Sequence, residues 1–360
     1  MTHPRPDLRA LTSVRGLAAW MVVLYHIRLS IAGLPQGAVD VLAKGYLAVD
    51  FFFLLSGFVI WMSWSHRLRE RGAAEIPAFL QKRIARIWPL HIVVLGGAVA
   101  LALLLWATGR HDAAEFSFQE LPLHVLLIQN WGFTPALTWN DPAWSISAEL
   151  GAYLLFPLLA FAIDWRRVPT LAVLAAVLAG AVLLASVFAV AGAVSLGADI
   201  ARLGLVRCVI EFAMGTAVAA LWLRWRDAPQ LPAAFSGVGA MMLLITPLPE
   251  TLRVPLGFAG LLLALALTSG MRGNPLERRM LHALGEISYA TYLGHFLLWF
   301  AFKLAFVTDA NAVPPGLIAL YLTLVLASSV ALYHWVERPA QRWVNARRWP
   351  TNRPLLPRSP

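Results

Sequence analysis

The chain has 360 residues, of which 59% are hydrophobic and only 13% are charged. A soluble globular domain carries about 25% charged residues, so this composition excludes a soluble protein and indicates an integral membrane protein. The formal net charge of +10 does not indicate nucleic-acid binding, because the basic residues lie in short runs between apolar segments, as loop residues of membrane proteins do. The single cysteine, Cys208, excludes an intramolecular disulfide and a cysteine-cluster metal site, and we expect no metal.

Ten apolar segments predict the fold class, an all-α integral membrane protein built as a bundle of about ten transmembrane helices. The expected helices cover 10–31, 45–64, 84–107, 144–163, 168–190, 204–223, 234–249, 255–271, 286–307 and 315–336. The first segment has no small-residue cleavage site after it, so we interpret it as a retained helix rather than a signal peptide. Segment 121–131 is apolar but too short to span, which favours a re-entrant or interfacial piece.

The basic residues predict the orientation of the bundle. If the N-terminus is cytoplasmic, most lysines and arginines fall in cytoplasmic loops, as the positive-inside rule requires, and both termini are then cytoplasmic. We expect a membrane core over 1–338 and a flexible, basic cytoplasmic tail over 339–360, which is rich in Arg and Pro. No internal repeat is visible, which disfavours transporters built from duplicated halves.

Two ionisable residues inside the first expected helix are functional candidates, because such groups cost roughly 2.5–3.5 kcal/mol each in a membrane. Arg15 and His26 are eleven residues apart, which places them on nearly one helix face and about 16 Å apart along the axis. Arg15, at the cytoplasmic end, can bind phosphate oxygens in pairs. His26, deeper in the bilayer, can take a proton from a hydroxyl. Alternatively, Arg15 reaches the headgroups and His26 bonds a neighbouring helix.

Six sequence blocks resemble the acyltransferase family 3 membrane proteins, which modify O-antigens, peptidoglycan, exopolysaccharides and some antibiotics. The blocks are LRALTSVRGLAAWMVVLYH (8–26), GYLAVDFFFLLSGFVI (45–60), KRIARIWPLH (82–91), WSISAE (144–149), GEISYATYLGHFLL (285–298) and VERPAQRW (336–343). They follow the order of the family and cover nearly the whole chain. Each block is weak alone, but six in the right order make the resemblance specific.

The resemblance implies a multi-pass protein of the bacterial inner (cytoplasmic) membrane that uses acyl-CoA, with acetyl-CoA as the expected donor. It assigns the role of catalytic base to His26 and that of its partner to Arg15. Arg83 and Arg86 are one turn apart and on the same predicted membrane side as Arg15, so the three are the expected binding site for the CoA phosphates. The alternative for Arg83 and Arg86 is ordinary positive-inside anchoring.

Acidic and hydroxyl groups complete the expected site. Asp50 and Glu149 lie in the outer half and can orient His26 or bind sugar hydroxyls, so both are catalytic candidates; Asp50 can instead complement a helix dipole. Ser56, before Gly57, is a substrate-binding candidate, and it can form an acyl-enzyme if a base lies nearby. The Ser-Gly pair is otherwise a close-packing site between helices.

Three further residues are expected to bind the acceptor. They are Trp144, Tyr292 and His295. His295 lies in the middle of the ninth expected helix, where it either lines an acceptor tunnel or bonds a helix neighbour.

The predicted function is transfer of an acyl group, expected to be acetyl, from cytoplasmic acyl-CoA to a hydroxyl of a cell-surface or lipid-linked carbohydrate. The expected partners are this carbohydrate or glycolipid acceptor and membrane lipid. Two alternatives stay open: a non-enzymatic membrane carrier or flippase, and a subunit that passes acyl groups to a separate periplasmic transferase.

Overall fold

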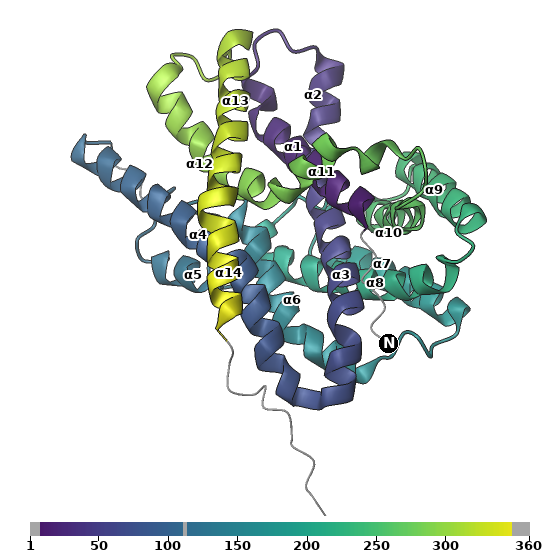
Figure 1. Cartoon of the computed structure of the whole chain (residues 1–360). Helices are drawn as coiled ribbons and strands as arrows, with labels where there is room; N and C mark the ends of the chain where they lie inside the picture. Colours follow the sequence, from purple (N-terminus) through teal and green to yellow (C-terminus); the bar gives the residue numbers. More distant parts are fainter. Residues whose placement is uncertain (1–7, 111–113, 348–360) are drawn as a thin grey trace, which may run out of the picture.

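The computed structural model describes residues 8–110 and 114–347, which fold as a bundle of α-helices without a named strand in these ranges (Figure 1). The helices are α1 Arg9–Ile27, α2 Gln36–Leu42, α3 Ala48–Arg71, α4 Ile76–Ala107, α5 Leu121–Leu126, α6 Ala143–Ala162, α7 Thr170–Val190, α8 Ile200–Trp225, α9 Gln230–Ile245, α10 Glu250–Thr268, α11 Arg279–Glu286, α12 Ser288–Phe306, α13 Pro315–Leu332 and α14 Arg338–Ala346. The expectation of an all-α protein is confirmed for the described residues.

Each of the ten expected segments coincides with one helix: α1, α3, α4, α6, α7, α8, α9, α10, α12 and α13. Within the described residues, seven segments are long and apolar enough to cross a membrane, and one of them, Gln36–Ala107, contains both α3 and α4. Helix α9 has 16 residues and is short for a span. The protein is therefore a multi-pass membrane protein, while the number of ten spans and the cytoplasmic termini stay predictions.

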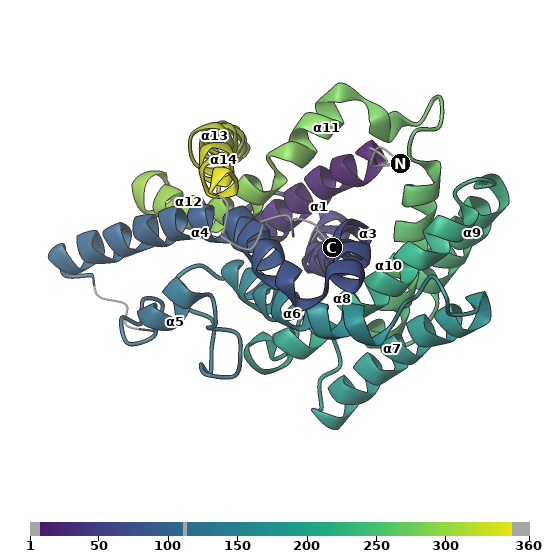
Figure 2. The ribbon, with the colours of Figure 1, turned by 60° about the horizontal axis from the view of Figure 1, so that its bottom comes forward.

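Helices α1, α3 and α8 lie in the middle of the molecule in both views, with α4 and α9 toward opposite sides (Figures 1 and 2). Helix α3 packs against α8 and α6, while α1 packs against α11 and α12. The inner faces carry large apolar side chains such as Phe58, Trp61 and Phe212, which belong to one continuous buried cluster. This packing brings segments far apart in the sequence around α1 and α3.

Glycine brings the backbones of α3 and α8 into contact. A Cβ atom on Gly57 would lie 1.9 Å from the carbonyl oxygen of Phe212, and one on Gly215 would lie 1.9 Å from the carbonyl oxygen of Leu54. Both distances are far below any real contact. The interpretation of Gly57 as a close-packing residue is therefore confirmed.

Replacing Gly57 with alanine is expected to destabilise the protein by about 1–3 kcal/mol, because the added methyl group must push two backbones apart. The measurement is thermal unfolding in detergent. Gly96→Ala in α4 is the matched control, since a Cβ at Gly96 meets nothing within 4 Å and alanine favours a helix over glycine. Equal melting temperatures for the two variants would contradict the predicted backbone contact.

The C-terminal segment differs from the expectation of a flexible tail from residue 339 onward. Residues Arg338–Ala346 form α14, which packs against α4. The Gln81 side-chain amide donates to the carbonyl oxygens of Val344 and Arg347, each at 2.7 Å. The expectation is wrong for residues 339–346 because these bonds and the packing hold them as a helix; residues 348–360 lie outside the described residues.

The segment between α4 and α6 folds back onto both helices. Its short helix α5 is fixed to α4, where the Trp88 indole N–H donates to the carbonyl oxygen of Val125 at 2.9 Å. The Trp131 indole N–H donates to the carbonyl oxygen of Ser147 in α6, also at 2.9 Å. Segment 121–131 is thus a compact piece on the bundle, and its depth in the membrane stays a prediction.

Candidate active site

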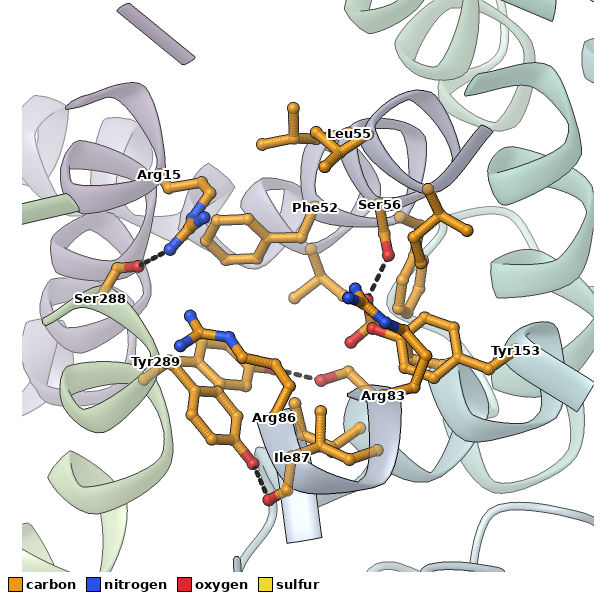
Figure 3. A pocket seen from close by; sticks show the side chains of 18 residues that line it. Arg15, Phe52, Leu55, Ser56, Arg83, Arg86, Ile87, Tyr153, Ser288 and Tyr289 are labelled. Carbon is orange, nitrogen blue, oxygen red and sulfur yellow. Dashed lines mark hydrogen bonds between the residues drawn. The ribbon is translucent and has the colours of Figure 1, made fainter. Parts of the chain in front are cut away.

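A cavity of about 860 Å³ lies among α1, α3, α4, α6 and α12, and it gathers most of the candidates from the sequence (Figure 3). It is lined by Arg15, Val49, Phe52, Phe53, Leu55, Ser56, Val59, Ile60, Arg83, Arg86, Ile87, Ser145, Ile146, Glu149, Tyr153, Ser288, Tyr289 and Tyr292. Five different helices thus supply one mixed polar and aromatic lining. Six of the ten candidates from the sequence belong to this lining: Arg15, Ser56, Arg83, Arg86, Glu149 and Tyr292.

 

The other four candidates, His26, Asp50, Trp144 and His295, do not belong to the lining of this cavity.

Three arginines face this cavity (Figure 3). Arg15 on α1 donates from Nη2 to the carbonyl oxygen of Gly285 at 3.1 Å and to Ser288 Oγ at 3.2 Å, so the end of α11 and the start of α12 together hold its guanidinium in place. Arg86 on α4 forms an ion pair with Glu337, which is 1% exposed. The guanidinium of Arg83 lies 6.0 Å from the ring centre of Tyr153.

The arginines give the cavity the chemistry of a phosphate site. Three guanidinium groups around one opening supply planar, permanently charged donors that match phosphate oxygens. In the same cavity Ser56 Oγ of α3 donates to Glu149 Oε1 of α6. A carboxylate and a hydroxyl therefore lie within the cavity beside the cationic groups. Glu149 therefore contacts Ser56, whereas His26 contacts a side chain of α12.

His26 is paired with His295, which lies 269 residues further along the chain on α12. His295 Nε2 lies 3.2 Å from His26 Nδ1, and the ring centres are 5.0 Å apart. His26 Nδ1 also lies 2.8 Å from the carbonyl oxygen of Val22, and His295 Nδ1 lies 3.1 Å from that of Thr291.

These partners assign the protons of the pair. A carbonyl oxygen can only accept, so each Nδ1 must carry a hydrogen. His295 Nε2 is then the acceptor for the Nδ1–H of His26, and the lone pair of His26 is on Nε2. His26 is therefore arranged to take a proton at Nε2, and His295 Nε2 can stabilise the resulting imidazolium by accepting from the Nδ1–H of His26, which is shared with the Val22 carbonyl oxygen.

Tyr292 lies between the cavity and the histidine pair. It lines the cavity, and its ring centre is 6.4 Å from that of His295 and 5.8 Å from that of Phe52. Its hydroxyl lies 2.7 Å from Ser145 Oγ and donates to the carbonyl oxygen of Pro142 at 3.2 Å. One side chain thus joins the arginine cavity to the histidines.

Asp50 and Trp144 belong to a different cluster. Arg207 of α8 donates to both carboxylate oxygens of Asp50, each at 2.6 Å, and the two side chains are 1% and 0% exposed. The guanidinium carbon of Arg207 lies 5.5 Å from the ring centre of Trp144. Both oxygens of Asp50 are therefore occupied by Arg207, and this geometry gives Asp50 a structural role.

Sequence reasoning missed Arg207 and Glu211 as members of this cluster. Both are buried in α8, and Glu211 has no hydrogen-bond partner for either carboxylate oxygen among the described residues. A signal was present, because two ionisable residues one turn apart inside an apolar segment are expected to face the interior of a bundle. Their partner Asp50 could not be identified from spacing.

Comparison with known proteins gives the class and then the family. The bundle and its cavity define a multi-pass membrane protein with an arginine-lined pocket between its helices. Residues 8–334 match a family model described as an acyltransferase domain, and the chain belongs to the acyltransferase 3 family.

Several relatives align with most of this chain. Acyltransferase MdmB of Streptomyces mycarofaciens is 29% identical over 95% of this chain and 93% of its own length. Exopolysaccharide production protein ExoZ of Rhizobium meliloti (strain 1021) is 27% identical over 84% of this chain and 92% of its own length. No solved structure matches this chain.

Proposed function

We propose that this acyltransferase moves a short acyl group, acetyl in the simplest case, from cytoplasmic acyl-CoA to a hydroxyl of an extracytoplasmic carbohydrate. The observation that carries the proposal is the pairing of an arginine-lined cavity with a histidine whose Nε2 can accept a proton. The names of the relatives support both the acyl transfer and the carbohydrate acceptor, since one is an acyltransferase and the other serves exopolysaccharide production.

The donor fits the cavity chemically. Arg15, Arg83 and Arg86 supply the positive charge that CoA phosphates require. The axial distance of about 16 Å between positions 15 and 26 of one helix is bridged by the extended arm that links those phosphates to the thioester. The acyl carbonyl then lies toward His26, with Tyr292 beside its path.

The chemistry follows from the proton positions. The acceptor hydroxyl gives its proton to His26 Nε2 while its oxygen forms a bond to the acyl carbon, and the carbon–sulfur bond of the thioester breaks. CoA leaves as the thiolate, which takes the proton from His26 Nε2 to become the thiol, so His26 returns to its neutral form. His295 accepts from Nδ1–H of His26 throughout and thereby stabilises the positive charge of the imidazolium.

The experiment is release of free CoA from acetyl-CoA by the purified protein in detergent, with neutral methyl glycosides as acceptors. CoA release that requires a glycoside supports the proposal. Movement of glycoside across a vesicle membrane without CoA release would favour the carrier alternative. CoA release that appears only with an added periplasmic transferase would favour a relay of acyl groups to that partner.

Arg83→Ala is expected to raise the KM for acetyl-CoA by roughly 10–100-fold, because a hydrogen bond to a charged group contributes about 1.5–3 kcal/mol. Arg83 forms no ion pair with a carboxylate among the described residues, so this variant leaves none of them without its partner. Arg167→Ala, at a side chain that is 88% exposed, is the matched control and should leave KM unchanged. With S-acetylpantetheine, which has no phosphate, wild type and Arg83→Ala should behave alike. A persisting difference would contradict the phosphate role.

A further inference from the structure

A second hollow lies among α7, α8, α9 and α10, on a different part of the bundle from the arginine cavity. Helices α9 and α10 lie side by side at the right of both views (Figures 1 and 2), and α7 and α8 pack against α10. The hollow has a free volume of about 550 Å³. It shares no lining residue with the arginine cavity and is therefore a separate site.

The hollow has a buried floor and exposed walls. Val218, Leu221 and Leu263 line its floor and are at most 5% exposed. Leu178 of α7 and Phe235 of α9 also line it and are 52% and 76% exposed. We call the space between these five residues the lateral groove. Because its walls are exposed, the groove opens sideways, toward the hydrocarbon of a membrane that surrounds the bundle.

The lining of the lateral groove is apolar. None of the described residues that line it is charged. The hydroxyl of Ser236, which also lines the groove, already donates to the carbonyl oxygen of Pro232 at 2.6 Å. A phosphate or a sugar would lose its hydrogen bonds to water in this groove without gaining others. The lining therefore selects an apolar ligand.

The dimensions of the groove fit one acyl chain. Trp225 and Val218 both line the groove from α8, and their separation of seven residues is about 10 Å along the helix axis. One leaflet contains about 15 Å of hydrocarbon, half of a core that is about 30 Å thick. A helix about 10 Å wide would occupy about 800 Å³ over the length of the groove. This is more than the free volume, whereas a single extended acyl chain is much thinner.

Positive charge is concentrated at the end of the groove where α8 finishes. The turns 164–169 and 224–229 contain four arginines and two aspartates. Arg224 joins these turns, because it donates to two carbonyl oxygens of the first. The turns at the opposite ends of these helices, 191–199 and 246–249, contain neither lysine nor arginine. The two ends therefore differ in charge, and the basic end is the one predicted to face the cytoplasm.

Arg226 lies at this basic end, directly after Trp225. Its side chain is 46% exposed, and its Nε lies 3.9 Å from Asp227 Oδ1, which is a loose ion pair. Trp225 has the position of an aromatic residue at the membrane–water interface. An anionic headgroup at this level would lie beside a guanidinium while its chain entered the apolar groove.

We propose that the lateral groove binds one acyl chain of an anionic membrane phospholipid and that Arg226 contacts the phosphate of its headgroup. The apolar lining, the depth of one leaflet and the basic end all match this one ligand. The site goes beyond the proposed acyl transfer and does not depend on it.

Quenching of tryptophan fluorescence by brominated lipids tests the site in the full-length protein, reconstituted in phosphatidylcholine vesicles. A small share of the vesicle lipid is dibrominated phosphatidylglycerol or dibrominated phosphatidylcholine. The signal of Trp225, one of 15 tryptophans, is the difference between each protein and its Trp225→Phe counterpart. Phosphatidylglycerol should quench this signal at an about fivefold lower lipid fraction, because one arginine near the membrane surface favours an anionic lipid by about that factor.

Two variants separate the chain from the headgroup. Ser236→Phe fills the groove from a partly exposed position and should weaken quenching by both lipids about tenfold, since displacing two methylene groups costs about that factor. Ala234→Phe, at an exposed position of the same helix outside the lining, is the matched control. Arg226→Gln should remove only the preference for phosphatidylglycerol, and Arg202→Gln at the other end of α8 should retain it.

Equal quenching by the two lipids in the unsubstituted protein would overturn the proposal, as would equal quenching in Ser236→Phe and Ala234→Phe. A dimer in detergent that Ser236→Phe converts to a monomer would assign the groove to a second copy of the chain and would also overturn it. None of these results requires CoA release, so failure of the lipid site and failure of the proposed function are distinguishable.

Discussion

His26→Ala is expected to lower the rate of acyl transfer by about 10²–10⁴-fold, the range that a positioned general base contributes. Nδ1 of His26 is committed to Val22 and His295, so Nε2 is the atom that takes the proton, and alanine removes it. The measurement is CoA release at saturating acetyl-CoA and glycoside. Under the proposed function the donor binds in the arginine cavity, so its KM should change little while kcat falls.

Controls separate this loss from misfolding. His66→Ala, at a side chain that is 64% exposed, should retain full activity. His295→Ala should reduce kcat less than His26→Ala does, since it removes the partner of the imidazolium but leaves Nε2 in place. The amount of each variant in the membrane and its elution in detergent should match wild type. Full activity of His26→Ala would exclude His26 as the base.

Arg207→Met is expected to destabilise the protein by about 3–5 kcal/mol, the cost of leaving one charge of a buried pair without its partner. Asp50 receives two hydrogen bonds from this guanidinium, and burial leaves no water to replace them. The measurement is the rate of thermal inactivation and the melting temperature in detergent, since unfolding of membrane proteins is often irreversible.

A double variant makes the test specific. Asp50→Leu combined with Arg207→Met should recover much of the lost stability, because well-packed apolar residues often replace a buried ion pair without loss. Arg202→Met is the control on the same helix, where the arginine is 61% exposed, and it should change the melting temperature little. Equal destabilisation by Arg207→Met and Arg202→Met would contradict the buried pair.

The helices could be predicted from the sequence because an apolar run of membrane length has few alternatives to a helix. The spacing of Arg15 and His26 likewise followed from helix geometry. The partner of His26 could not be predicted from helix geometry, because His295 lies 269 residues away in the sequence and meets His26 only through the packing of α1 on α12. The tail was predicted from composition alone, which misses the contacts that hold α14 on α4.

The same limit applied to the candidate site. The sequence indicated Ser56 and Glu149 separately, but their hydrogen bond depends on how α3 and α6 pack.

The glycine contact between α3 and α8 has a consequence for any attempt to reshape the cavity by mutation. Gly57 directly follows Ser56, so the backbone contact fixes how far Ser56 extends into the cavity. A larger residue at Gly57 or Gly215 would separate the two helices before it changed the cavity itself. The lining is better altered at Val59, which belongs to the cavity and is 42% exposed.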